Sequence, residues 1–249
     1  MNAVITSLVF ISLVGVGYSW RYPRNADQTF WAFRTCQRQS EGAKSLREWY
    51  RWNLPNDEDT HCYVKCVWLH LGLYNEQNKS LRVDRIMEQF NSRSVAIPGD
   101  INTISGPTDG TCKDIYDKTI NFFNNNVNDL RTAFYGIKKL SDEWFTQNSN
   151  TKPKGTKISD FCNAENREKG GADCQHACSA YYYRLVDEDN EPIHFRNLNI
   201  LGITDEQFAS CVKASKNKQG CKVADTMYNC VEKHNSQALK ILDNQSPTY

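Results

Sequence analysis

The chain has 249 residues, 39% of them hydrophobic, and a formal net charge of +1. Acidic and basic residues are balanced in both halves of the sequence. No basic stripe for a polyanion stands out, so neither nucleic acid nor an acidic membrane surface is expected as the main partner.

The first nineteen residues are an uncharged apolar run that ends in Gly17, Tyr18 and Ser19. We interpret 1–19 as a cleaved secretory signal peptide. A membrane anchor is the alternative, but the apolar core between Ala3 and Val16 is short for a span of about 20 residues and no stop-transfer pattern follows. We therefore expect secretion and no stable membrane association.

Helical spacing of apolar residues marks most of the chain up to residue 123. Helices are expected at 27–37 with Asp27 as a possible cap, at 43–53, at 60–71 and in a longer stretch after Cys112. The segment 95–110 is rich in Pro and Gly and reads as a loop. Strand alternation is not convincing anywhere.

A polar segment at 147–157 contains Pro153 and Gly155, and is interpreted as a linker. Beyond it, helices are expected at 174–187, 204–216 and 222–233, with Thr204 and Gln207 as a plausible start of the second. The expected organisation is a signal peptide at 1–19, an N-terminal domain at 20–148 and a C-terminal domain at 149–249. Domains of this size gain from cross-links, because their cores are modest.

The ten cysteines follow a recurring pattern. An even number in an exported chain is typical of five disulfides. Cys62 and Cys66 form a CxxxC pair, which on a helix places both sulfurs on one face, and Cys174 and Cys178 repeat the device. Spacing alone leaves 15 connectivities open among the six cysteines of the second half. A metal site that also uses His61 and His70 is an alternative, but the oxidising environment disfavours it.

The order of cysteines in the second half resembles that of the insect odorant-binding-protein fold. The segments 49–55, 59–68 and 71–74 sharpen this resemblance. They look like the first domain of the long-form D-seven salivary proteins of blood-feeding flies, which are two fused odorant-binding-like domains. The resemblance implies an all-α fold of two tandem, disulfide-stapled helical domains. It also implies five disulfides, namely Cys36–Cys66, Cys62–Cys112, Cys162–Cys178, Cys174–Cys221 and Cys211–Cys230.

The resemblance further implies capture of host mediators in saliva. Members of this family take cysteinyl leukotrienes, and in some cases thromboxane analogues, in the first domain. Such a lipid needs an apolar tunnel with a cation or hydrogen-bond donor at one end. The tunnel is assigned to aromatic residues, and the polar end to basic residues near the linker and to the Tyr63 hydroxyl. The expected ligand-binding residues are Phe30, Phe33, Trp49, Trp52, Tyr63, Lys138, Lys154 and Lys157.

Family members often bind biogenic amines in the second domain, but this sequence departs from that pattern. The interval between Cys162 and Cys174 is short, and Tyr228 stands where a second acid would follow Asp225. Biogenic amines, namely serotonin and histamine, are therefore not the expected ligands, and amine binding through the C-terminal domain is kept only as an alternative to lipid capture.

Two other classes of protein are alternatives to a lipid-binding one. A secreted phospholipase is the nearest enzyme, but its adjacent cysteines and His-Asp pair are missing, as are GxSxG and HExxH motifs. We expect no catalytic residues, cofactor or metal, and a monomeric chain. A protein-binding anticoagulant that acts through its surface stays open as an alternative, because an exposed patch is not visible in a sequence.

Overall fold

The computed structural model describes residues 23–24, 26–135, 146–147, 151–153, 155–164, 173–187, 190–193 and 196–248. The expected signal peptide, Lys138 and Lys154 lie outside these residues. Within them, no helix is both long and apolar enough to cross a membrane.

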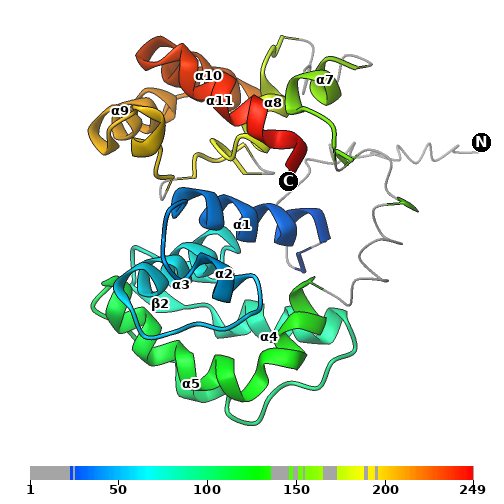
Figure 1. The fold of residues 1–249 in the computed structure, drawn as a ribbon, viewed down its shortest axis with the longest axis vertical. Helices are drawn as coiled ribbons and strands as arrows, with labels where there is room; N and C mark the ends of the chain where they lie inside the picture. The colour runs from blue at the N-terminus through cyan, green and yellow to red at the C-terminus, as the bar shows by residue number, and fades with distance from the viewer. Residues whose placement is uncertain are drawn as a thin grey trace, which may run out of the picture.

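The first half of the molecule, residues 26–135, is a compact set of helices with one small hairpin (Figure 1). Its elements are α1 (Ala26–Gln39), α2 (Leu46–Trp49), α3 (Glu58–His70), β1 (Tyr74–Asn75), β2 (Ser80–Leu81), α4 (Val83–Ser92), the 3-10 turn η1 (Ile101–Ile104), α5 (Cys112–Leu130) and the π-helical turn η2 (Arg131–Tyr135). The expected helices at 27–37 and 60–71 and the one after Cys112 are present. The helix expected at 43–53 is only one turn long.

Two features of the first half were not predicted. Strands β1 and β2 pair antiparallel, with Tyr74 opposite Leu81, and α4 follows directly. The strands are two residues long, which is too short for an alternating pattern to show in the sequence.

The second half, residues 155–248, is also helical. Its elements are α7 (Ile158–Asn163), α8 (Ala177–Tyr182), η4 (Asn199–Leu201), α9 (Asp205–Ser215), α10 (Cys221–His234), α11 (Ser236–Gln245) and η5 (Ser246–Thr248). Helix α9 starts as expected, because the Thr204 side chain accepts from the backbone N–H of Gln207 and the Gln207 side chain accepts in return. Helix α8 is shorter than the expected 174–187, and α11 was not predicted.

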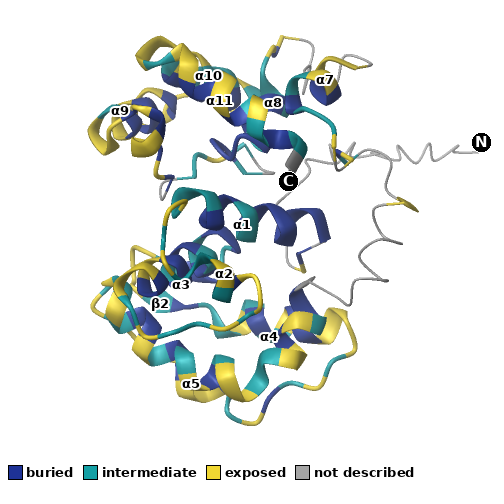
Figure 2. Cartoon of the chain, viewed as in Figure 1, coloured by how far each residue is buried: buried dark blue, intermediate teal, exposed yellow. Residues whose placement is uncertain are grey.

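Helix α1 lies between the two halves and contributes to both hydrophobic cores (Figure 1). Phe30 and Trp31 pack in the core of the second half, and the Trp31 ring meets Tyr182 edge-on at 5.3 Å. Ala32 packs in the core of the first half, and Cys36 packs beside Trp49. Figure 2 accordingly shows α1 largely buried. This helix of the first half therefore joins the two halves.

Polar contacts reinforce this junction at both ends of α1. The Tyr181 hydroxyl donates to Asp27 Oδ2 at 2.9 Å. Arg38 donates to the Gln245 side chain at 2.7 Å and to its backbone carbonyl at 2.8 Å. Arg196 Nη1 donates to Gln39 Oε1 at 2.9 Å. These bonds fix the second half against the first.

All ten cysteines are paired. The pairs are Cys36–Cys66, Cys62–Cys112, Cys162–Cys178, Cys174–Cys221 and Cys211–Cys230. This is the pairing that the resemblance implied. In the first half, one CxxxC helix, α3, is therefore tied to α1 on one side and to the start of α5 on the other.

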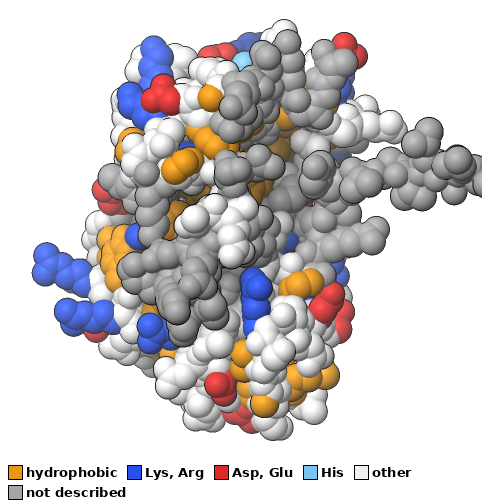
Figure 3. All heavy atoms as spheres, turned by 90° about the vertical axis from the view of Figure 1, so that its right-hand side faces the viewer, with side chains coloured by type: hydrophobic (Ala, Val, Ile, Leu, Met, Phe, Trp, Pro, Cys, Tyr) orange, Lys and Arg blue, Asp and Glu red, His pale blue; other side chains and the backbone are white. Residues whose placement is uncertain are grey.

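The expected linker contains a buried cation. The Lys152 side chain is almost fully enclosed, and its Nζ donates to the carbonyls of Pro153, Thr156 and Ser246. The segment therefore packs against the end of α11 as well as joining the halves. On the face drawn in Figure 3, basic and acidic side chains are mixed, in keeping with the balanced charge.

Candidate functional site

An apolar cavity lies inside the first half, between α1, α3, α5 and η2. Its lining residues are Phe33, Trp49, Trp52, Leu54, Tyr63, Val64, Val67, Trp68, Leu71, Thr119, Ile120, Phe123, Leu130 and Phe134. The cavity volume among them is about 50 Å³. Side chains thus narrow the cavity, and a long ligand has to displace some of them.

Two polar side-chain atoms in this lining are bonded to protein partners. Trp49 Nε1 donates to Thr60 Oγ1 at 2.9 Å. The Thr119 hydroxyl donates to the Ile115 carbonyl at 2.8 Å. Because a buried polar group needs a hydrogen-bond partner, these bonds leave a surface suited to hydrocarbon.

Aromatic rings form two groups around the cavity. Trp49 stacks on Tyr63, with ring centroids 4.2 Å apart. Trp52 contacts Phe33 at 5.0 Å and lies nearly parallel to Phe123 at 6.1 Å. Trp52 has a φ of +62°, which places the residue in the left-handed region where the chain leaves α2. The second group borders solvent, since Trp52 and Phe123 are only half-buried.

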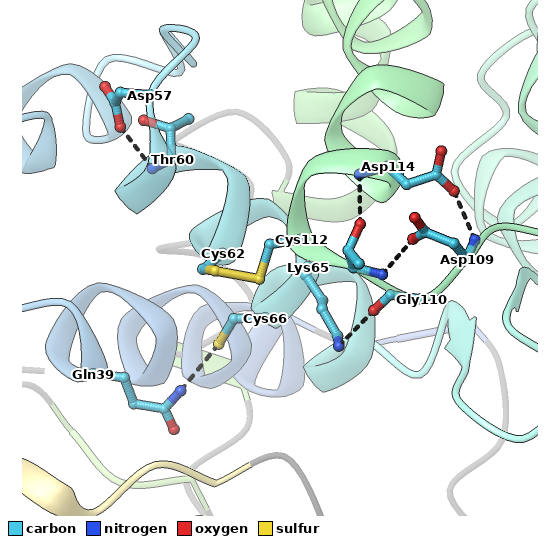
Figure 4. Close-up of a disulfide and its surroundings, with 11 residues drawn as sticks. Gln39, Asp57, Thr60, Cys62, Lys65, Cys66, Asp109, Gly110, Cys112 and Asp114 are labelled. Atoms are coloured by element: carbon cyan, nitrogen blue, oxygen red, sulfur yellow. Dashed lines mark hydrogen bonds between the residues drawn. A yellow bond between two sulfur atoms is a disulfide. The ribbon is translucent and has the colours of Figure 1, made fainter.

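Disulfides and loop contacts hold the walls of the cavity in place (Figure 4). The Cys62–Cys112 bond joins α3 to the first residue of α5, and Lys65 Nζ donates to the Gly110 carbonyl at 2.9 Å beside it. Asp57 caps α3 by accepting from the backbone N–H of Thr60 at 2.8 Å. The two helices that carry most of the lining therefore meet in a cross-linked corner.

The expected ligand-binding residues do not all lie here. Phe33, Trp49, Trp52 and Tyr63 line the cavity. Phe30 does not, because its position on α1 places its ring in the core of the second half.

The lysines expected to bind the polar end of the ligand are not found among the described residues of the cavity lining either. Lys157 stands before α7 and donates to Asn244 Oδ1 at 3.3 Å, so it is not among the lining residues. Lys138 and Lys154 fall outside the described residues. The apolar residues of α5 and η2 were missed because their spacing marked them as ordinary core.

A second, polar cavity of about 610 Å³ lies between the halves. Its lining residues are Arg24, Leu69, His70, Gly72, Tyr74, Asn75, Glu76, Gln77, Arg82, Arg85, Arg184, Asp187, Pro192 and Ile193. Two of its basic groups bond to protein: Arg24 Nε donates to the Leu71 carbonyl and Arg85 Nη1 to the Gly72 carbonyl. These two arginines hold the loop after α3 in place.

Asp225, the acid expected for an amine site in the second half, has a structural role. Asp225 Oδ1 accepts the backbone N–H groups of Gln175 and His176 at 2.9 and 2.8 Å, just before α8. The His176 ring stacks on Tyr228 at 3.9 Å. Asp225 Oδ2 lies 4.0 Å from Lys222 Nζ, so this carboxylate already satisfies backbone donors with one oxygen and pairs with a lysine ammonium group through the other.

Metal binding finds no support in the clusters that the described residues form. Cys36, Cys66 and His70 lie close together, as do Cys211, Cys230 and His234. In both clusters the cysteines are bonded to each other, and a disulfide sulfur is not the thiolate that a metal requires. The ring of His61 is engaged with Asn56 at 2.7 Å.

Two titratable groups at the junction of the halves have shifted pKa values. Burial raises the pKa of Asp27 to about 6, although the Tyr181 hydroxyl and the charges of Arg184 and Lys152 oppose this. Burial lowers the pKa of Lys152 to about 8, while Asp27 and Asp243 act in the opposite direction. Neither group lines the apolar cavity, so both belong to the packing of the halves.

Known proteins resemble the chain in sequence and structure. The model of the PBP/GOBP family matches residues 27–103. Long form salivary protein D7LC of Phlebotomus papatasi is 62% identical, over 99% of this chain and 98% of that protein. The solved D7 protein from Phlebotomus duboscqi is 99% identical, with a TM-score of 0.88, over 93% of this chain and 100% of that one.

More distant solved structures share the fold. The AeD7–leukotriene E4 complex is 17% identical, with a TM-score of 0.67, over 92% of both chains. The AnSt-D7L1–U46619 complex is 20% identical, with a TM-score of 0.60, over 92% of this chain and 90% of that one.

Proposed function

Since the chain belongs to the long-form D7 family of secreted salivary proteins, we propose that it captures host lipid mediators in the apolar cavity of its first half. The ligands are cysteinyl leukotrienes and thromboxane. Their removal opposes inflammation, vasoconstriction and platelet aggregation. The observation that carries the proposal is the almost wholly apolar lining of that cavity.

Two neighbours with the same fold support the choice of ligand. One is a complex with leukotriene E4 and another a complex with U46619, a thromboxane analogue. Capture of mediators at nanomolar levels requires about 12 kcal/mol of binding free energy. Burial of an acyl chain at about 0.8 kcal/mol per methylene supplies much of it, before the costs of association.

The proposed mechanism is stoichiometric binding and not catalysis. The family is one of binding proteins with the odorant-binding fold. Among the described residues, the lining of the cavity includes no histidine or carboxylate that would act as a general base. A mediator incubated with the protein is therefore expected to be recovered unchanged by mass spectrometry.

Amine capture by the second half is not proposed. Asp225, the acid that such a site would use, accepts two backbone N–H groups. Serotonin and histamine are thus expected to give no binding heat.

Calorimetric titration of the full chain with leukotriene E4, U46619 and serotonin tests the proposal. Ile120 lines the cavity from α5, so Ile120→Phe is expected to fill the space and reduce lipid affinity at least tenfold. Ile200→Phe is the matched control, because Ile200 is 56% exposed in the second half. One-to-one lipid binding that Ile120→Phe weakens and Ile200→Phe leaves unchanged supports the proposal. No heat with either lipid overturns it.

A further inference from the structure

An exposed arginine stands at the solvent edge of the apolar cavity. Arg131 is the first residue of η2 and follows Leu130, which is buried and lines the cavity. Its guanidinium carbon lies 5.7 Å from the centre of the Trp52 ring. The positive charge is therefore held beside a ring that is itself part of the lining.

Trp52 marks the place where the lining gives way to solvent. Its ring packs between Phe33 and Phe123 and is half-buried, whereas Trp49 on the other side of the cavity is 2% exposed. A guanidinium over the face of this ring is attracted by its π-electrons and still accessible to water. Arg131 thus meets the two requirements of a polar end: it is next to the hydrocarbon surface and outside it.

Protein carboxylates do not neutralise this charge in the described part of the chain. Arg51, the neighbour of Trp52, is 3.9 Å from Glu48 in an ion pair. Arg34 lies over the rings of Phe30 and Tyr50, away from the cavity. Of these arginines, Arg131 alone joins a lining ring to a charge that has no ion pair among the described residues.

We propose that Arg131 binds the carboxylate of the captured lipid at the edge of the cavity. This inference rests on the proposed function and gives it a chemical preference: the protein selects lipids with a free acid over the corresponding esters. A guanidinium presents paired N–H donors to a carboxylate, whereas an ester carries no charge and accepts more weakly.

The test compares U46619 with its methyl ester in calorimetric titrations of the full chain. The unmodified protein is expected to bind the acid at least about threefold more tightly than the ester. In Arg131→Gln, the acid is expected to bind no better than the ester, while affinity for the ester stays the same. Arg131→Lys is expected to restore part of the preference. Arg51→Gln, which removes a neighbouring charge that is already paired, serves as the matched control.

The outcomes separate this inference from the proposed function. An acid preference that survives in Arg131→Gln, or no preference in the unmodified protein, overturns the role of Arg131 while leaving lipid capture in place. Failure of the unmodified protein to bind either form overturns both. Circular dichroism shows whether each variant is folded, and Arg131 is exposed, so its replacement is expected to leave the fold intact.

Discussion

The indole ring of Trp49 lies flat against the ring of Tyr63, with their planes 3° from parallel. Trp49 is 2% exposed and also donates to Thr60 at the start of α3. Trp49→Ala is therefore expected to lower the free energy of unfolding by about 3–5 kcal/mol. Tyr63→Phe keeps the stacked ring and is expected to cost less than about 1.5 kcal/mol. Urea unfolding measures the free energy of unfolding of both variants. Equal losses of stability in the two variants would contradict the stabilising role of the stacked Trp49 and Tyr63 rings.

Stability should depend on pH through Asp27. Burial raises its pKa from 3.8 to about 6, so between these values the folded protein holds a proton that the unfolded chain has lost. The free energy of unfolding is expected to fall as pH rises through this window and to stay lower above it. Asp27→Asn should remove this dependence and raise stability at pH 7 by on the order of 2 kcal/mol.

Urea unfolding at pH 4.5 and 7.5 measures this effect. Asp129→Asn, which changes an exposed carboxylate on α5, is the control and is expected to behave like the unmodified protein. Equal pH dependence in Asp27→Asn and the unmodified protein would show that Asp27 is not the group responsible.

Two disulfides are expected to differ in their effect on capture. Cys62–Cys112 closes 50 residues and joins the two helices that carry most of the cavity lining. Its removal with paired alanines is expected to cost about 4 kcal/mol in the chain-entropy model and to weaken lipid binding. Cys162–Cys178 closes 16 residues in the second half, and its removal is expected to cost about 3 kcal/mol without affecting capture.

Calorimetric titration below the unfolding temperature of each variant distinguishes the two cases. Equal loss of lipid binding in both would argue that the cavity depends on global stability and not on its own cross-link.

The first half is not expected to be stable without the second. Phe30 and Trp31 pack in the second core, and a chain that ends at residue 148 would expose both rings. Such a fragment should self-associate at micromolar concentration in size-exclusion chromatography. Trp31→Gln in the fragment should reduce this association, because it removes the larger ring. A monomeric fragment with full lipid affinity would contradict the structural role assigned to α1.

Apolar spacing in the sequence predicted the helices in which that spacing is regular, and the resemblance implied the five disulfides. The hairpin at Tyr74 and Leu81 was not predicted, because each strand is too short to show an alternating pattern. Phe30 was assigned to the tunnel because it lies among the aromatic residues near the segments that carry the resemblance, and helical periodicity does not tell which of two cores a ring enters. Arg131 was missed because one exposed arginine has no distinguishing pattern in a sequence.

The shared helix also bears on how fast a ligand enters. A hinge motion between the halves would draw Phe30 and Trp31 out of the second core, at a cost of about 2 kcal/mol or more for each ring. Entry at the solvent edge of the apolar cavity needs only rotamer changes of half-buried rings such as Trp52 and Phe123. Association should therefore proceed without domain opening, and the residence time of a captured lipid should be set by how often these rings move aside.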